Sequence, residues 1–228
     1  MNFTIGGIRD IRSGSWRRGR TGACTAAAEF TGLWGWDVVP GARATANGCS
    51  CGRPPVAPGS APGPPGACRA PGAHPLATAP VVPAGATLDE VTRVWAGFPH
   101  ATLMLPVGRT FDVLEVGETA GRRALVRLER MGLPLGPVVA TPQGRAQFLV
   151  APGAAVGLPR LLYRMGWDGA ALDLRALGPG DHITAPPSDR GGLGPVRWLR
   201  TPCWRTAGPP EARLVLGALG HAAHRSRR

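Results

Sequence analysis

Short apolar blocks separated by glycine, proline and polar residues recur along this chain, and most have the length of a β-strand. Blocks of four to seven residues rich in Val, Leu and aromatic side chains predict strands. They lie at residues 36–40, 102–106, 110–116, 137–141, 146–150, 171–177, 182–185 and 196–199. We expect the blocks at 171–177 and 182–185 to pair as a hairpin.

Longer segments with apolar residues three and four positions apart predict helices between these strands. Thr87 and Glu90 form a capping box that begins a helix running to Trp95, and Gly132 ends a helix over residues 118–131. Further helices are expected at 23–33, at 158–165, where Pro159 interrupts the start, and after Pro209 or Pro210. Helices alternating with strand pairs predict an α+β (mixed α/β) protein, in which helices cover a mixed sheet.

One long stretch, residues 53–86, has too few apolar side chains to fold by itself. It contains 10 Pro, 5 Gly and 9 Ala among 34 residues, so we expect an extended loop inserted in the domain. The expected organisation is a basic disordered arm over 1–20, one domain over 21–205, and a C-terminal helix with a basic tail over 206–228.

The formal net charge of +12 is concentrated at the two ends of the chain. Residues 1–20 carry a net +4 and residues 190–228 a net +7, which leaves the middle nearly neutral. These ends are either a nucleic-acid surface or solvated tails that maintain solubility. The candidate phosphate contacts are Arg17, Arg18, Arg20, Arg225, Arg227 and Arg228.

Two features of the sequence bear on location. The apolar runs are shorter than the roughly 20 residues that cross a bilayer, so no membrane partner is expected. The five cysteines are an odd number, and the N-terminus lacks the apolar segment of a secretion signal. We therefore expect a reducing, cytoplasmic location rather than a disulfide framework.

Three cysteines and one histidine gather around the Pro/Gly/Ala-rich loop. Cys49 and Cys51 precede it, and Cys68 and His74 lie within it. Three thiolates and an imidazole form the tetrahedral ligand set of a structural Zn²⁺, and metal binding would order a segment that has no core of its own. The alternative is a set of free thiols in an irregular loop.

Several strings in this order resemble the bifunctional DNA primase/polymerase N-terminal (Prim-Pol) family. They are LWGWDVVPGA, CSCG with a later Cys and PGAHPL, VGRTFDVLEV, LERMGLPLGPVVATPQGRAQFLVAP, LDLRALGPGDHITAPPS and GPVRWL. The resemblance covers about residues 25–205 and implies the archaeo-eukaryotic primase fold, in which an RRM-like catalytic sheet packs on a small N-terminal α/β unit. It also implies template-directed nucleotidyl transfer with Mg²⁺ or Mn²⁺, with DNA and nucleotides as partners.

The first motif of the family is a pair of acidic residues separated by one position, which point the same way on a strand. Aligned on LEV, Glu115 takes the first acidic position and Gly117 replaces the second. Asp112 lies three residues before Glu115, so it faces the opposite way on a regular strand and reaches the site only through a bulge. Glu118 is interpreted as the charge at a helix N-terminus.

The second and third motifs supply the remaining candidates. Ala146 or Gln147 falls where the family has a phosphate-binding His, and the third motif survives as Asp173, which shares a strand face with Arg175. We assign Asp112, Glu115 and Asp173 as catalytic metal ligands. Arg145, Gln147 and Arg175 are assigned to nucleotide binding.

The incomplete motifs leave more than one function open. The sequence favours a catalytically degenerate relative that binds nucleotide or nucleic acid, because two motifs lack a required side chain. The first alternative is an active, metal-dependent DNA primase/polymerase. The second is a protein-interaction module whose basic ends bind an acidic partner.

Overall fold

The computed structural model describes residues 15–54, 56, 66–167, 172–203 and 208–225 of the chain. The side chains of residues 15–21 and 225 are outside this description. All six arginine side chains named as candidate phosphate contacts at the two ends therefore lie outside the described part, as does most of the 1–20 arm.

The larger half of the protein is a five-stranded sheet in the order β10-β6-β7-β5-β8. Two βαβ-type segments joined by a β-hairpin supply β5, β6, β7 and β8, and β10 is added beside β6. The elements are β5 Asp112–Gly117, α3 Glu118–Arg130, β6 Val138–Thr141, β7 Arg145–Val150, α4 Ala154–Arg164, β8 Leu174–Leu177 and β10 Arg197–Arg200. The β5-to-β8 portion has the βαββαβ connectivity and strand order of the expected RRM-like fold.

Strand direction differs from the sequence expectation. We expected a mixed sheet, whereas every described pair of strands is antiparallel. After the crossover helix α3, strand β6 runs parallel to β5, but β7 lies between these two strands in the sheet. Parallel strands are therefore separated by an antiparallel neighbour, and the expected α+β class is confirmed.

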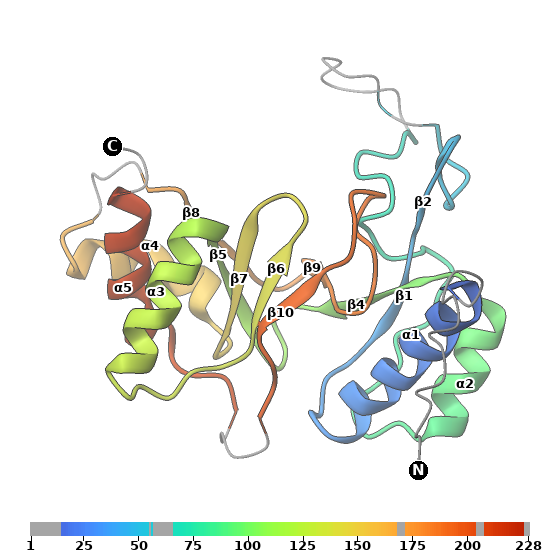
Figure 1. Cartoon of the computed structure of the whole chain (residues 1–228), viewed down its shortest axis with the longest axis horizontal. Helices are drawn as coiled ribbons and strands as arrows, with labels where there is room; N and C mark the ends of the chain where they lie inside the picture. The colour runs from blue at the N-terminus through green and yellow to red at the C-terminus, as the bar shows by residue number, and fades with distance from the viewer. Residues whose placement is uncertain (1–14, 55, 57–65, 168–171, 204–207, 226–228) are drawn as a thin grey trace, which may run out of the picture.

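The smaller half is a three-stranded antiparallel sheet of β1 Val39–Gly41, β4 Thr102–Pro106 and β9 His182–Thr184. It packs with helices α1 Ser15–Gly32 and α2 Leu88–Gly97, which lie side by side in Figure 1. We call this half the N-terminal module. The predicted capping box of α2 is present, because Thr87 and Glu90 bond to each other's backbone amides.

The prediction that residues 171–177 and 182–185 pair as a hairpin is wrong. Strand β8 pairs with β5 in the large sheet, whereas β9 pairs with β4 in the small one. Between them the chain turns at Gly178, whose amide donates to the Asp181 carboxylate over 2.9 Å, and passes from one sheet to the other. Both strands were predicted, but the partner of each is set by tertiary packing.

Two cores cover the two faces of the large sheet. Leu114, Phe148 and Leu128 belong to the core under α3 and the terminal helix α5 Ala212–Arg225. On the opposite face, Val113 and Leu149 join the core of the N-terminal module. Alternation along β5 therefore points Val113 and Glu115 toward the module and Leu114 and Val116 toward the helices.

Two helices begin away from the expected positions. α4 starts at Ala154 rather than at 158 and contains Pro159, and α1 starts at Ser15 rather than at 23. Among the described residues, no helix combines the length and the apolar composition that crossing a bilayer requires.

Candidate functional site

A buried carboxylate, Glu115, marks the centre of the site. It lies on β5 directly opposite Gln147 of β7 and Arg175 of β8 in the antiparallel register. The side chain is only 2% exposed. Three polar side chains from three neighbouring strands thus share one sheet face, where the apolar core of the N-terminal module gives way to polar residues.

Both carboxylate oxygens of Glu115 are engaged. Oε1 accepts hydrogen bonds from Nε of Arg145 at 3.0 Å and from Nε of Arg175 at 2.8 Å, and Oε2 accepts one from Nε2 of Gln147 at 2.7 Å. Burial raises the pKa of Glu115, but the bonds from Arg175, Gln147 and Arg145 outweigh it and hold the pKa below its usual value. Glu115 is therefore a buried anion with two arginine partners.

Arg145 joins this anion to a second one. Its Nη1 donates to Oδ2 of Asp173 over 2.6 Å while its Nε contacts Glu115. The bond to Asp173 is the main reason why the pKa of Arg145 is raised. One guanidinium thus bridges two of the three carboxylates that the sequence analysis assigns to metal binding.

Gly117 shows what is missing from this cluster. A Cβ built on Gly117 would lie 3.2 Å from Oδ2 of Asp173 and 4.0 Å from Nη1 of Arg145. A side chain at this position would point into the space beside Arg145 and Asp173. The position that the first family motif assigns to the second acid is therefore at the site, but it contributes no oxygen.

The structure does not bring Asp112 or Glu118 into the cluster. Asp112 lies on the opposite face of β5, fully buried, and its Oδ2 accepts a bond from the Ala155 amide at the start of α4 over 2.8 Å. The register of β5 against β7 is regular, without a bulge that would turn Asp112 around. Glu118 begins α3, and its carboxylate binds Arg122 and Arg197.

A pocket of about 280 Å³ opens in front of the cluster. The large sheet forms its floor, residues 70–73 of the Pro/Gly/Ala-rich loop form one wall, and the 190–193 loop forms another. The lining residues are Ala70, Pro71, Ala73, Glu115, Thr141, Gln143, Arg145, Arg175, Arg190, Gly191 and Leu193. Arginines from β7, from β8 and from the 190–193 loop thus line one cavity.

Arg190 is the residue of this pocket that sequence reasoning missed. It counted only as part of the basic C-terminal end, because an arginine beside two glycines is typical of a solvated loop. In the structure it is half-buried, and its Nη1 donates to Oγ1 of Thr184 over 3.3 Å. Burial lowers its pKa below the usual value. The only local signal is its position two residues after the APPS string.

The four expected zinc ligands do come together. The ligand atoms of Cys49, Cys51, Cys68 and His74 all lie within 4.8 Å of one another, and Nε2 of His74 is 3.3 Å from the sulfurs of both Cys49 and Cys68. Nδ1 of His74 lies 2.7 Å from the carbonyl of Pro75, which only accepts, so Nδ1 carries the proton. The Nε2 lone pair therefore faces the thiols, as a metal ligand requires.

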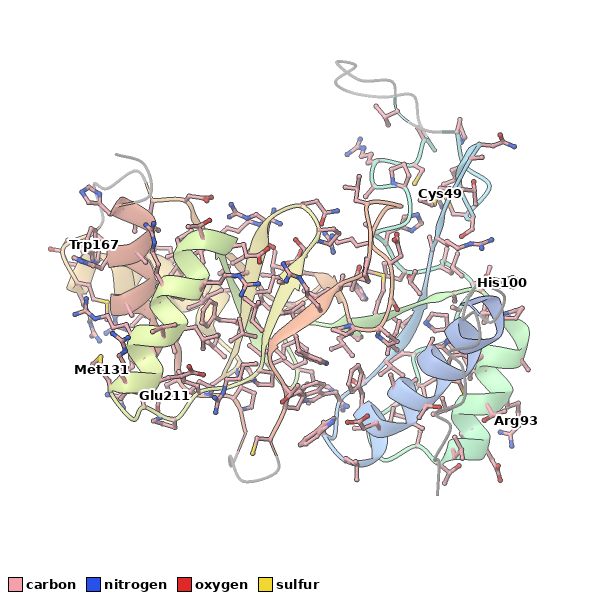
Figure 2. The ribbon with its side chains drawn as sticks, in the orientation of Figure 1. Cys49, Arg93, His100, Met131, Trp167 and Glu211 are labelled. Carbon is pink, nitrogen blue, oxygen red and sulfur yellow. The ribbon has the colours of Figure 1, made fainter. Side chains whose placement is uncertain are left out.

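The local packing around these thiols is small. Cys49 and Cys68 are buried with Ala42, and Cys51 and Leu76 pack beside them. Figure 2 shows Cys49 among the loops that extend beyond β1. Burial raises the pKa of Cys49, but the backbone amides of Cys51 and Gly72 and the side chain of His74 bring it down to about 6, whereas burial raises that of Cys68 to about 11. This cluster can hold a metal ion.

Fold and site together define an RRM-like domain with a charged cluster on the sheet face that meets an N-terminal module. The family described as bifunctional DNA primase/polymerase, N-terminal, matches residues 27–212, and the chain belongs to this family. It is a DNA primase/polymerase-like protein. Neither the comparison with curated proteins nor that with solved structures gives a match.

Proposed function

We propose that this domain binds the phosphate groups of nucleotides or nucleic acid through arginines and has lost efficient nucleotidyl transfer. The observation that carries the proposal is the bridge from Glu115 through Arg145 to Asp173, with bonds of 3.0 and 2.6 Å. A fixed guanidinium neutralises these acids where the family would place a divalent cation. An arginine attracts phosphate, but it does not supply the open coordination positions that activate a hydroxyl.

The donor set does not fit a pair of Mg²⁺ or Mn²⁺ ions. Both oxygens of Glu115 already accept hydrogen bonds, Gly117 has no oxygen, and Asp112 lies on the other face of the sheet. Two-metal transfer needs several carboxylate oxygens converging on ions about 3.5–4 Å apart. The proposed function therefore depends on the arginines and not on these ions, and Gln147 serves to orient Glu115.

A binding titration in EDTA tests the positive half of the proposal. Labelled nucleotide or oligonucleotide should bind to the parent, and Arg175→Gln should weaken binding because its guanidinium lines the pocket. Arg93→Gln is the matched control, since Arg93 lies on the outer side of α2 in Figure 2 and is exposed. Equal binding by the parent and Arg175→Gln would place the ligand elsewhere.

A primer-synthesis assay tests the negative half. The protein is incubated with single-stranded template, nucleotides and Mn²⁺, with Asp173→Ala as the comparison. We expect little or no extension by either protein. Robust extension by the parent that disappears in Asp173→Ala would instead establish the alternative, an active DNA primase/polymerase.

We also propose that Cys49, Cys51, Cys68 and His74 hold a structural Zn²⁺, because three thiolates and an imidazole match its preferred ligands. The ion would link β3 (Gly48–Cys49) to the 66–76 segment. Such thiolates need a reducing compartment, which supports a cytoplasmic location. Metal analysis of the purified protein should give one zinc per chain, lowered in Cys49→Ser and unchanged in Cys24→Ser.

A further inference from the structure

We infer that the ligand of the arginine pocket is a phosphomonoester, such as the 5′-phosphate of a nucleic-acid strand or of a nucleoside monophosphate, rather than a metal-bound triphosphate. The inference rests on the proposed function and specifies its ligand. It follows from the charge, the available donors and the size of the pocket.

The charge of the lining suits a single phosphate. Three arginines and one buried glutamate line the cavity, and Asp173 is paired to Arg145 at its side, so these five groups together carry one net positive charge. A phosphomonoester carries a charge of about −1.5 to −2 at pH 7. A triphosphate adds further negative charges that a metal ion normally neutralises, and the site does not fit that ion. Of the two ligands, a single phosphate therefore comes closer to matching the charge of the pocket.

Two of the arginines that line the pocket also retain N–H donors. Within the described residues, Arg175 is engaged through Nε and Arg190 through Nη1, so other N–H groups of both side chains are available. Arg175 comes from the sheet floor and Arg190 from the opposite loop. Charge-assisted bonds from two guanidiniums are the strong and geometrically specific contacts by which proteins hold phosphate.

The size and the walls of the pocket select the phosphate end of the ligand. Its volume of about 280 Å³ is just below the range of roughly 300–1,000 Å³ that encloses a drug-sized molecule. Ala70, Pro71 and Ala73 form one wall, and no aromatic side chain is among the described lining residues. Because base recognition usually relies on aromatic stacking, we expect the base to stay outside and its identity to matter little.

The test compares two oligonucleotides of one sequence, one with a 5′-phosphate and one with a 5′-hydroxyl, by fluorescence anisotropy in EDTA. We expect the phosphorylated strand to bind at least about tenfold more tightly. Arg190→Gln should abolish the difference, and Arg93→Gln should keep it. Because Arg190 is half-buried, thermal unfolding of the variant is measured, and Arg175→Gln serves as a second variant at an exposed position.

Competition identifies the carrier of the phosphate. Displacement by deoxyadenosine monophosphate, but not by deoxyadenosine, shows that a free nucleotide suffices, whereas displacement by the phosphorylated strand alone identifies a strand end. Both outcomes support the inference. Equal binding of the two strands, or tighter binding of Mg²⁺–dATP than of the monophosphate, overturns it while the proposed function stands. Failure to bind any nucleotide or strand overturns both.

Discussion

The backbone amide of Gly191 donates a hydrogen bond to the carbonyl of Gly72 over 3.2 Å. The amide of Gly72 in turn donates to Sγ of Cys49 over 3.4 Å. Gly191 follows Arg190 directly, so a short chain of contacts links the cysteine cluster to an arginine of the pocket. The segment between Cys68 and His74 thus belongs to both sites, since it carries metal ligands at its ends and a pocket wall in its middle.

Removal of zinc should therefore weaken phosphate binding in the neighbouring pocket. Without the ion, the wall at residues 70–73 loses the cross-link that holds it, and Arg190 loses its support. A coupling of the usual size would lower the affinity for a 5′-phosphorylated strand by a factor of about 5 to 150, measured by calorimetry before and after chelation.

Cysteine variants give the control for this coupling. Cys49→Ser should reproduce the effect of chelation, whereas Cys24→Ser should not, because Cys24 lies on α1 near Thr92 and away from the cluster. Reciprocally, the phosphorylated strand should slow the loss of zinc to a chelator. The same strand affinity with and without metal would show that the two sites are independent.

Gly72 itself should be sensitive to substitution. It has a φ of +68°, and a Cβ on it would lie 2.4 Å from the backbone nitrogen of Ala44. Gly52 has a similar φ of +74° but no atom within 4 Å of its Cβ position. Both alanine variants pay about 1–2 kcal/mol for the left-handed backbone, and only Gly72→Ala adds a clash with main-chain atoms.

Urea unfolding of the two variants separates these costs. We expect Gly72→Ala to lower the free energy of unfolding by at least about 1 kcal/mol more than Gly52→Ala, together with a loss of zinc. Equal losses in the two variants would mean that the 66–76 segment moves away from β2 (Ala44–Thr45) at little cost.

The sequence predicted the elements of the fold better than their partners. Local signals such as the Thr87 capping box and the apolar block of residues 110–116 placed α2 and β5 within a few residues of their positions. The partners of β8 and β9 depend on contacts between distant segments, which a strand pattern does not encode. For the same reason the antiparallel direction of the whole sheet was not predicted.

The candidate site shows the same limit. Strand alternation predicted correctly that Glu115 and Asp112 lie on opposite faces of β5. Ligand chemistry was enough to select the four residues of the cysteine cluster. The burial of Arg190 depends on how its loop closes over the sheet, and the position of Arg145 between two acids depends on how β7 and β8 pair with β5. Neither property is visible in the spacing of residues.

Glu115 should make stability depend on pH in the acid range. Its pKa in the folded protein lies below the value of about 4.3 expected in the unfolded chain, so ionised Glu115 stabilises the fold. That contribution is complete above the unfolded pKa and is lost as the pH falls through the lower folded pKa. Glu115→Gln removes the charge but keeps an acceptor oxygen.

We expect Glu115→Gln to cost about 1–3 kcal/mol at pH 7, because Arg145 and Arg175 lose their charged partner. The cost should shrink as the pH falls below the unfolded value of about 4.3 toward the lower folded pKa of Glu115, below which the parent is also neutral at this position. Urea unfolding at pH 7 and at pH 3 measures both values. A cost that is the same at both pH values would show that the charge of Glu115 contributes nothing.

Restoring the missing acid should restore metal binding. Gly117 has φ −55° and ψ 140°, which any residue adopts, and its Cβ direction leads toward Asp173. In Gly117→Asp the new carboxylate repels Asp173, so the variant alone should be less stable than the parent. A divalent ion between the two carboxylates would relieve this repulsion, and the stabilisation by ligand grows with ion concentration.

Thermal unfolding against Mn²⁺ concentration measures the effect. We expect the melting temperature of Gly117→Asp to rise with Mn²⁺, and to rise further when Arg145→Ala also removes the competing guanidinium. The parent should show no such rise. Gly97→Asp should show none either, because it adds an acid at the end of α2, where no neighbouring atom lies within 4 Å of the Cβ position. A parent that responds to Mn²⁺ as strongly as the double variant would show that Arg145 leaves the acids when metal arrives. Arg145 would then be a displaceable gate in an active enzyme rather than a permanent substitute for the ion.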